Sequence, residues 1–243
     1  MSIVCGHRGL GPTRAGGSFP ENTLESIRAA MQAGATMVEF DVQLSADDVP
    51  VLMHDDTLDR TTTGRGCVSG ATLAQLRELD AGVGTPLAGQ GVRVATLVEL
   101  LRAVPIALNV EIKVADAACR RHDAERVADV VLAALADDPL RGSRHVLISS
   151  FDLELLRVVR GRDAVVPLGW LTERDDLRAS WVALALDAGC QAIHPHHAFI
   201  TAPLADECRA AGVALNTWTV NQRARAERLA SWGVAVIITD DPA

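Results

Sequence analysis

Apolar runs and helical segments alternate along almost the whole chain. Ala188-Gly189, Ala211-Gly212 and Trp232-Gly233 each close a helical segment, and a short apolar run follows each pair. Glycine is common just past the end of a helix, and Asn, Asp or Thr at its start, as at Asn22-Thr23. Strands that alternate with helical segments of ten or more residues predict parallel βα units.

Nine short apolar runs are predicted to be strands. They cover residues 3–7, 35–42, 49–54, 106–113, 145–151, 165–171, 190–195, 213–220 and 234–240. The second and third runs are separated only by a polar turn at 45–48, which is too short for a parallel crossover and predicts an antiparallel hairpin. Without the returning arm, eight parallel strands remain. The pattern therefore predicts an α/β protein with a (β/α)8 barrel, the TIM-barrel fold.

The hairpin extends the second barrel strand and has a consequence for chemistry. If its turn centres between residues 46 and 47, Glu39 faces His54 and Asp41 faces Leu52. The returning arm then brings His54 back to the mouth of the barrel, beside the carboxylates of the second strand.

Residues 55–93 interrupt the regular pattern. This stretch is rich in threonine and glycine, with one short helix predicted near Leu73 to Leu79, and we interpret it as a small insertion over the C-terminal face. Thr96 and Glu99 form a capping-box pattern that restarts the βα rhythm, and Pro105 ends the helix. We expect residues 1–243 to form a single barrel domain.

Charged and polar residues gather at the predicted C-terminal ends of the strands, where TIM barrels place their active sites. They are His7, Arg8, Glu39, Asp41, His54, Glu111 and Lys113. Residues i and i+2 of a strand point to the same side of the sheet. Glu39 and Asp41 therefore share one face of their strand, and Glu111 and Lys113 share one face of theirs. Three converging carboxylates need a proton or a cation, and an all-oxygen set suits Mg²⁺ or Ca²⁺.

The remaining groups suit chemistry on a phosphate. His7 and His54 are candidates for general base and general acid, while Arg8 and Lys113 are candidates for binding phosphate oxygens. A purely structural alternative stays open: Glu111 pairs with Lys113 as an ion pair, and the histidines are ordinary hydrogen-bonded residues.

Composition narrows the class of protein. The chain has 243 residues, a formal net charge of −8 and 49% hydrophobic residues, which argues against a nucleic-acid groove or an anionic-membrane patch. No apolar run reaches the length of a membrane-spanning helix, and we expect no integral membrane segment. The five scattered cysteines contain no CxxC pair, so we expect reduced thiols and a cytoplasmic protein. Among 23 basic residues Lys113 is the single lysine, which draws attention to its position.

An ordered set of motifs resembles the glycerophosphodiester phosphodiesterase family. The matching segments are residues 6–9 (GHRG), 20–23 (PENT), 38–42 (VEFDV), 50–55 (PVLMHD), 58–63 (LDRTTT), 79–82 (LDAG), 110–113 (VEIK), 149–151 (SSF), 218–221 (WTVN) and 237–240 (IITD), which together span essentially the whole chain. Ala95 stands where the family usually has a proline, a departure that touches no core catalytic position.

The resemblance implies hydrolysis of small glycerophosphodiesters to sn-glycerol 3-phosphate and an alcohol. It implies an acid/base pair, a metal site for Mg²⁺, Ca²⁺ or Mn²⁺, phosphate contacts and a wall for the glycerol or alcohol part. The resemblance makes His7 and His54 the acid/base pair, and Glu39, Asp41 and Glu111 the metal ligands. It makes Arg8 and Lys113 the phosphate contacts, and Trp218 the wall.

Three supporting positions and two functional alternatives remain open. Asn22 either caps the first helix or supports the site, Glu21 is a candidate partner of the metal site or of His7, and Phe151 either lines the pocket or belongs to the core. A lysophospholipase D-type phosphodiesterase and a glycerol-phosphate-binding barrel without turnover are the alternative functions.

Overall fold

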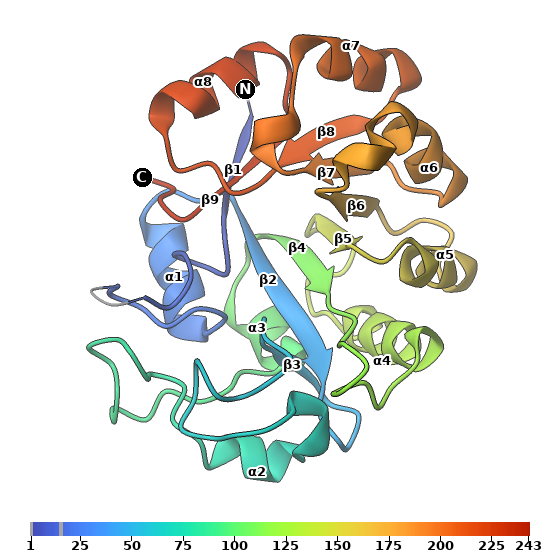
Figure 1. Ribbon diagram of the computed structural model, residues 1–243. Helices are drawn as coiled ribbons and strands as arrows, with labels where there is room; N and C mark the ends of the chain where they lie inside the picture. The colour runs from blue at the N-terminus through green and yellow to red at the C-terminus, as the bar shows by residue number, and fades with distance from the viewer. Residues whose placement is uncertain (1, 15–16) are drawn as a thin grey trace.

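The computed structural model describes residues 2–14 and 17–243, and in them eight parallel strands close into a barrel (Figure 1). The barrel strands are β1 (Ile3–Gly6), β2 (Met37–Leu44), β4 (Ala107–Ile112), β5 (Val146–Ser150), β6 (Leu168–Thr172), β7 (Ala192–Pro195), β8 (Ala214–Thr217) and β9 (Val236–Thr239). Strand β1 pairs with both β2 and β9, which closes the circle. The predicted TIM-barrel fold is confirmed.

The ninth strand, β3 (Pro50–Leu52), pairs antiparallel with β2, as predicted, but the predicted register was wrong by one residue. Val42 lies opposite Leu52, and the Met53 N–H donates to the Asp41 carbonyl at 3.1 Å. Ser45 pairs with Val49, so the turn contains the three residues 46–48 and centres on Asp47 instead of between Ala46 and Asp47. Asp48 lies in the left-handed region at φ 60°, and the Val49 N–H donates to the Ser45 hydroxyl. Such a turn centres on a residue instead of a peptide bond, which shifts every pair by one.

Helices surround the barrel and connect its strands (Figure 1). They are α1 (Leu24–Gln32), α3 (Leu97–Ala103), α4 (Ala124–Ala136), α5 (Leu153–Arg162), α6 (Trp181–Asp187), α7 (Ala202–Ala211) and α8 (Arg223–Ser231), with short 3-10 turns at Asp175–Ser180 and His197–Phe199. The capping box of Thr96 and Glu99 is present at the start of α3, and Gly212 ends α7 in the left-handed conformation. Among the described residues, no helix is both long enough and apolar enough to cross a bilayer.

The barrel strands alternate between two environments. Phe40 and Ile112 lie in the main hydrophobic core between strands and helices, whereas Met37 and Ile238 pack with Cys5 in a small cluster inside the barrel. This alternation follows from the two-residue period of a strand. Because Phe40 faces outward, its neighbours Glu39 and Asp41 face the barrel interior.

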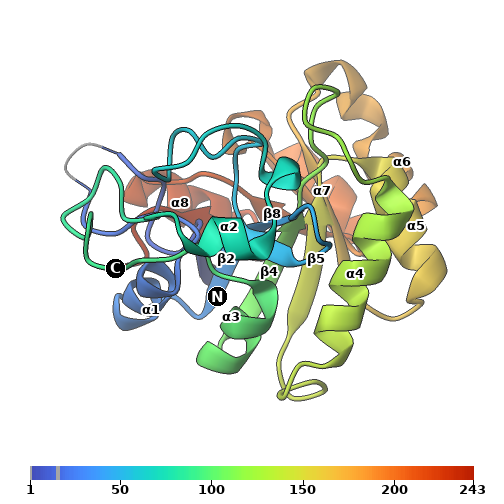
Figure 2. The same ribbon diagram turned by 90° about the horizontal axis from the view of Figure 1, so that it is seen from below.

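The segment between β3 and α3 packs beside the β2–β3 hairpin around a hydrophobic cluster of its own (Figure 2). It contains a 3-10 turn at Val68–Gly70 and the short helix α2 (Leu73–Arg77), close to the predicted helix. Val51 of β3, Val68 and Leu76 form the centre of this cluster. The hairpin thus supplies the surface against which the segment folds.

The expectation of five reduced thiols was wrong for two of them. Cys67, in the segment after β3, forms a disulfide with Cys119, in the loop after β4, with the two Cα atoms 5.4 Å apart. The hydroxyl of Ser69 also donates to the Cys119 carbonyl. Cys5, Cys190 and Cys208 are free and buried. A spacing of 52 residues gives no sequence signal for pairing, because only the fold brings these two loops together.

Candidate active site

Three carboxylates converge inside the barrel at the ends of β2 and β4. The parallel register places Asp41 directly beside Glu111 and Glu39 beside Asn109, and one oxygen from each of Glu39, Asp41 and Glu111 lies within 4.8 Å of the other two. All three side chains are buried. Glu39 Oε1 and Asp41 Oδ1 are buried and have no hydrogen-bond partner among the described residues. Unpartnered buried carboxylate oxygens fit a hard divalent cation, so this group could hold a metal ion.

The electrostatics of the three carboxylates point the same way. Burial and the charges of Asp41 and Glu111 raise the pKa of Glu39 well above its ordinary value. Burial and the charge of Asp41 raise the pKa of Glu111 to about 7. Burial alone would also raise the pKa of Asp41, but the charges of Lys113 and Arg8 hold it below its ordinary value. Such a cluster takes up protons when no cation is present and releases them when one binds.

His7 follows β1 and is held by a carboxylate from the other end of the chain. Its Nδ1 lies 2.7 Å from Asp240 Oδ1, and Asp240 also accepts a bond from Asn221 Nδ2 at 2.7 Å. The hydrogen bond from His7 helps to hold the pKa of Asp240 below its ordinary value, although burial acts in the opposite direction. An ionised carboxylate only accepts, so Nδ1 carries the proton and Nε2 is left for the pocket.

His54 is placed in the same way by its own neighbour. The returning arm of the hairpin ends at His54, whose Nδ1 lies 2.7 Å from Asp55 Oδ1. Burial, together with the charges of Lys113 and Arg8, lowers the pKa of His54, against the opposing effect of Asp41. His54 is therefore neutral over most of the physiological range, with the ring proton on Nδ1 and Nε2 unprotonated.

Two cations flank the carboxylates. Lys113 Nζ lies 3.0 Å from Glu111 Oε1 and 3.7 Å from Asp41 Oδ1, so the ion pair considered as a structural alternative exists together with the three-carboxylate cluster. The backbone N–H of Arg8 donates to Glu39 Oε2 at 2.9 Å, and its Nε lies 3.5 Å from Asp41 Oδ2. These carboxylates raise the pKa of both cations in spite of burial, so both stay charged.

Asn22 and Glu21 hydrogen-bond to residues of the candidate site, and the sequence did not specify these partners. Thr23, not Asn22, caps α1 through a bond from the Ser26 N–H. Asn22 instead donates from Nδ2 to Asp41 Oδ2 at 2.9 Å and accepts the Asp41 N–H at 3.1 Å. In the part of the chain that the structure describes, Glu21 makes no hydrogen bond to His7 or to the three carboxylates. It accepts a bond from Arg8 Nη1 at 2.9 Å.

These side chains surround a cavity of about 230 Å³ at the C-terminal mouth of the barrel. Its lining comprises His7, Arg8, Glu39, His54, Glu111, Lys113, Phe151, Leu171, Trp218, Thr219 and Ile238. Phe151 and Trp218 form one wall, with their rings edge to face and their centroids 5.5 Å apart. Phe151 is 42% exposed, so it lines the mouth instead of belonging to the core. The cavity therefore offers a charged side and an aromatic side.

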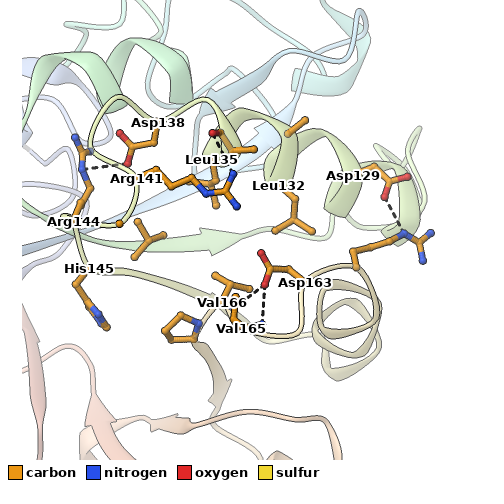
Figure 3. A pocket seen from close by; sticks show the side chains of 16 residues that line it. Asp129, Leu132, Leu135, Asp138, Arg141, Arg144, His145, Asp163, Val165 and Val166 are labelled. Atoms are coloured by element: carbon orange, nitrogen blue, oxygen red, sulfur yellow. Dashed lines mark hydrogen bonds and ion pairs between the residues drawn. The ribbon is translucent and has the colours of Figure 1, made fainter.

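A larger cavity, about 620 Å³, lies at the opposite end of the barrel, at the starts of β5 and β6 (Figure 3). Four of its charged side chains form ion pairs, Arg144 with Asp138 at 3.4 Å and Arg162 with Asp129 at 3.0 Å, while Arg141 and Asp163 bond to the backbone. No metal-ligand cluster or pair of carboxylate-bound histidines occurs in its described lining. The smaller cavity is the candidate active site on chemical grounds.

The sequence did not single out the residues that orient the two histidines. Asp55 and Asp240 stood inside recognised motifs, and Asp55 also at a strand end, but neither was assigned a contact. Arg60 belongs to the segment read as an insertion, and Asn221 follows Trp218. The position of these four residues, at a strand end or within a motif, was the sequence signal that could have marked them as functional. Their hydrogen-bond partners are determined by the fold.

The chain matches the model of the Glycerophosphoryl diester phosphodiesterase family over residues 7–243. It belongs to this family. A glycerophosphodiester phosphodiesterase from Caldanaerobacter subterraneus subsp. tengcongensis is 33% identical, with 99% of this chain and 95% of the relative covered. The enzyme described here is thus a phosphoric diester hydrolase, as the sequence predicted.

Solved structures agree with this assignment. A phosphodiesterase from Oleispira antarctica, solved with its product sn-glycerol-3-phosphate, matches with a TM-score of 0.89 and 28% identity, covering 100% of this chain and 94% of that one. A glycerophosphodiester phosphodiesterase from Thermotoga maritima matches with a TM-score of 0.76 and 26% identity, covering 100% and 96%.

Proposed function

We propose that the enzyme hydrolyses small glycerophosphodiesters to sn-glycerol 3-phosphate and an alcohol, and that the reaction takes place in the 230 Å³ cavity. The observation that carries the proposal is the convergence of three buried carboxylates and two carboxylate-bound histidines on one cavity. The product bound by the Oleispira antarctica relative supports the choice of glycerol phosphate. The aromatic wall of Phe151 and Trp218 would contact the carbon skeleton of the glycerol or of the alcohol.

The proposed roles follow from charge and geometry. Glu39, Asp41 and Glu111 would hold one divalent cation, Mg²⁺, Ca²⁺ or Mn²⁺, which when bound supplies positive charge that neutralises and orients the phosphate. Arg8 and Lys113 would bind phosphate oxygens and stabilise the charge that develops on them in the transition state.

His7 and His54 would move the protons. One takes a proton from the nucleophile, which is water or the neighbouring glycerol hydroxyl. As the new P–O bond forms and the P–O bond to the alcohol breaks, the other gives a proton to the leaving oxygen. With water the products form directly; with the hydroxyl, a cyclic phosphate forms first and water then opens it.

Release of sn-glycerol 3-phosphate from glycerophosphocholine tests the proposal. We expect EDTA to abolish release, and added Mg²⁺, Ca²⁺ or Mn²⁺ to restore it. The His54→Ala and His7→Ala proteins should lose most of the restored activity. Release that is indifferent to EDTA or to His54→Ala would remove the assigned roles. Turnover of lysophospholipids alone would favour a lysophospholipase D-type enzyme.

Two further predictions concern organisation and compartment. We propose that residues 1–243 form one domain with 55–93 as an insertion, which a single cooperative unfolding transition would support.

A cytoplasmic location also stays a prediction, although the Cys67–Cys119 bond removes the argument from reduced thiols. Alkylation of thiols in rapidly quenched cells tests it: full labelling of Cys67 supports the cytoplasm, and a protected Cys67 contradicts it.

A further inference from the structure

Arg60 joins two carboxylates that serve different parts of the active site. Its Nε donates to Asp55 Oδ2 at 2.7 Å and its Nη2 to Asp55 Oδ1 at 2.8 Å. On the other side, Nη1 donates to Glu21 Oε2 at 2.6 Å and Nη2 to Glu21 Oε1 at 2.8 Å. The planar guanidinium can contact two carboxylates in this way, whereas a lysine ammonium cannot reproduce the geometry.

Each of these carboxylates holds one residue of the pocket. Asp55 accepts a hydrogen bond from His54 Nδ1, and Glu21 accepts a hydrogen bond from Arg8 Nη1. Glu21 also accepts the Thr13 N–H at 2.6 Å, and its side chain is buried. Arg60 therefore connects the insertion to a candidate acid/base histidine and to a candidate phosphate-binding arginine.

Arg60 itself lies at the rim. Its side chain is 40% exposed, and it is outside the set of residues that line the 230 Å³ cavity. Its hydrogen bonds to Asp55 and Glu21 connect it to the residues that do line the cavity.

The carboxylate partners of His7 and His54 are held by different kinds of group. Asp240, which bonds to His7, is held by the neutral amide of Asn221, and Arg14 is more distant at 3.8 Å. The carboxylate behind His54 is instead held at two points by a full positive charge. Removing that charge would leave Asp55 free to turn, and with it the His54 ring.

We propose that Arg60 is a positioning residue of this phosphodiesterase: it locks Asp55 and Glu21, and through them the orientation of His54 and Arg8. The insertion, although it packs around a separate hydrophobic cluster, thereby sets the geometry of the active site. The inference rests on the roles proposed above for His54 and Arg8.

The test compares Arg60→Ala with wild type in the metal-loaded enzyme, using glycerophosphocholine. We expect kcat/KM to fall about 10- to 100-fold, the usual effect of losing a residue that orients an active-site group. The fall should divide into a lower kcat, through His54, and a higher KM, through Arg8. Arg65→Ala is the matched control, because Arg65 lies in the same segment and is 85% exposed, paired with Asp59; its activity should stay within twofold of wild type.

Three readouts separate positioning from a general loss of stability. Millimolar methylguanidinium should restore part of the activity of Arg60→Ala and none of that of His54→Ala. If Arg60 acts on kcat through Asp55, then Arg60→Ala should lower kcat little further in an Asp55→Asn background. The NMR signal of the His54 Nδ1 proton should also weaken or shift in Arg60→Ala.

Three results would overturn the inference: an Arg60→Ala enzyme within twofold of wild type; a loss of kcat that is fully additive with Asp55→Asn; or a loss that follows only the melting temperature and is not rescued. A wild-type enzyme that releases no sn-glycerol 3-phosphate would instead refute the proposed function, so the two failures are distinguishable.

Discussion

Asn22 makes two hydrogen bonds to Asp41, one of the three carboxylates that could hold a metal ion. Its Nδ2 donates to Asp41 Oδ2 at 2.9 Å, and its Oδ1 accepts the Asp41 N–H at 3.1 Å. Asn22 also has φ 55°, in the left-handed region that asparagine tolerates better than most residues. We predict that replacing it weakens both folding and metal binding.

The expected size follows from these contacts. Loss of a hydrogen bond to a charged group costs about 1.5 to 3 kcal/mol, and a buried N–H without a partner costs about 1 to 3 kcal/mol. Asp41 is 1% exposed, so water does not replace the lost partner easily. For Asn22→Gly, which keeps the backbone conformation, we expect a loss of about 3 to 5 kcal/mol in the free energy of unfolding. Asn22→Ala should lose about 1 kcal/mol more, because alanine disfavours the left-handed region.

Urea unfolding in EDTA measures the loss of folding stability. Calorimetric titration with Mg²⁺ or Ca²⁺ measures the loss of metal affinity. We expect metal affinity to fall about 10- to 100-fold in Asn22→Gly. Asn221→Gly is not a suitable control, because Asn221 contacts the His7 partner Asp240. Gln90→Ala, at an exposed loop position away from the cluster, serves instead and should change neither quantity.

A loss below about 0.5 kcal/mol in Asn22→Gly would refute the reasoning. It would mean that Asp41 finds other partners, or that water reaches the site. Equal stability of Asn22→Gly and Asn22→Ala would refute the part of the argument that concerns the backbone.

In EDTA, burial of Glu111 beside Asp41 raises its pKa to about 7 from an ordinary 4.5, so its contribution to stability is present below about pH 4.5 and is lost as the pH rises through 7. Relative to Glu111→Gln, the wild-type protein should therefore lose about 3 kcal/mol between pH 4.5 and pH 8, by denaturant unfolding. Gly169→Ala should destabilise the protein by about 1 to 3 kcal/mol, since the new Cβ would collide with His194 Nε2 inside the barrel. Replacing Cys67 and Cys119 by serine should lower stability by about 2 to 4 kcal/mol, because the bond closes a loop of 52 residues in the unfolded chain.

Each of these has a contrary outcome. A pH-independent difference between wild type and Glu111→Gln would show that the carboxylate is ionised throughout. Gly169→Ala at wild-type stability would show that His194 can move. For the disulfide, equal unfolding midpoints with and without a reductant would mean that the cross-link contributes nothing; the Cys208→Ser protein, which keeps the bond, is the control.

The sequence alone predicted the order of elements and the residues of the candidate active site. Strand alternation is local: Phe40 faces outward, so Glu39 and Asp41 face inward wherever the strand packs. Helix starts and ends are equally local, as the capping box at Thr96 and the glycine at position 212 show. Nine predicted strands and the convergence of the proposed site residues followed from this information.

The tertiary structure decided the contacts between segments far apart in the chain. His7 meets Asp240 across 233 positions, Arg60 meets Glu21 across 39, and Cys67 meets Cys119 across 52. No periodicity encodes such pairs, because they depend on barrel closure and on how the insertion packs. The hairpin register also depended on one residue of turn length. The sequence therefore supplied the chemical groups, and only the fold determined which partner orients each of them.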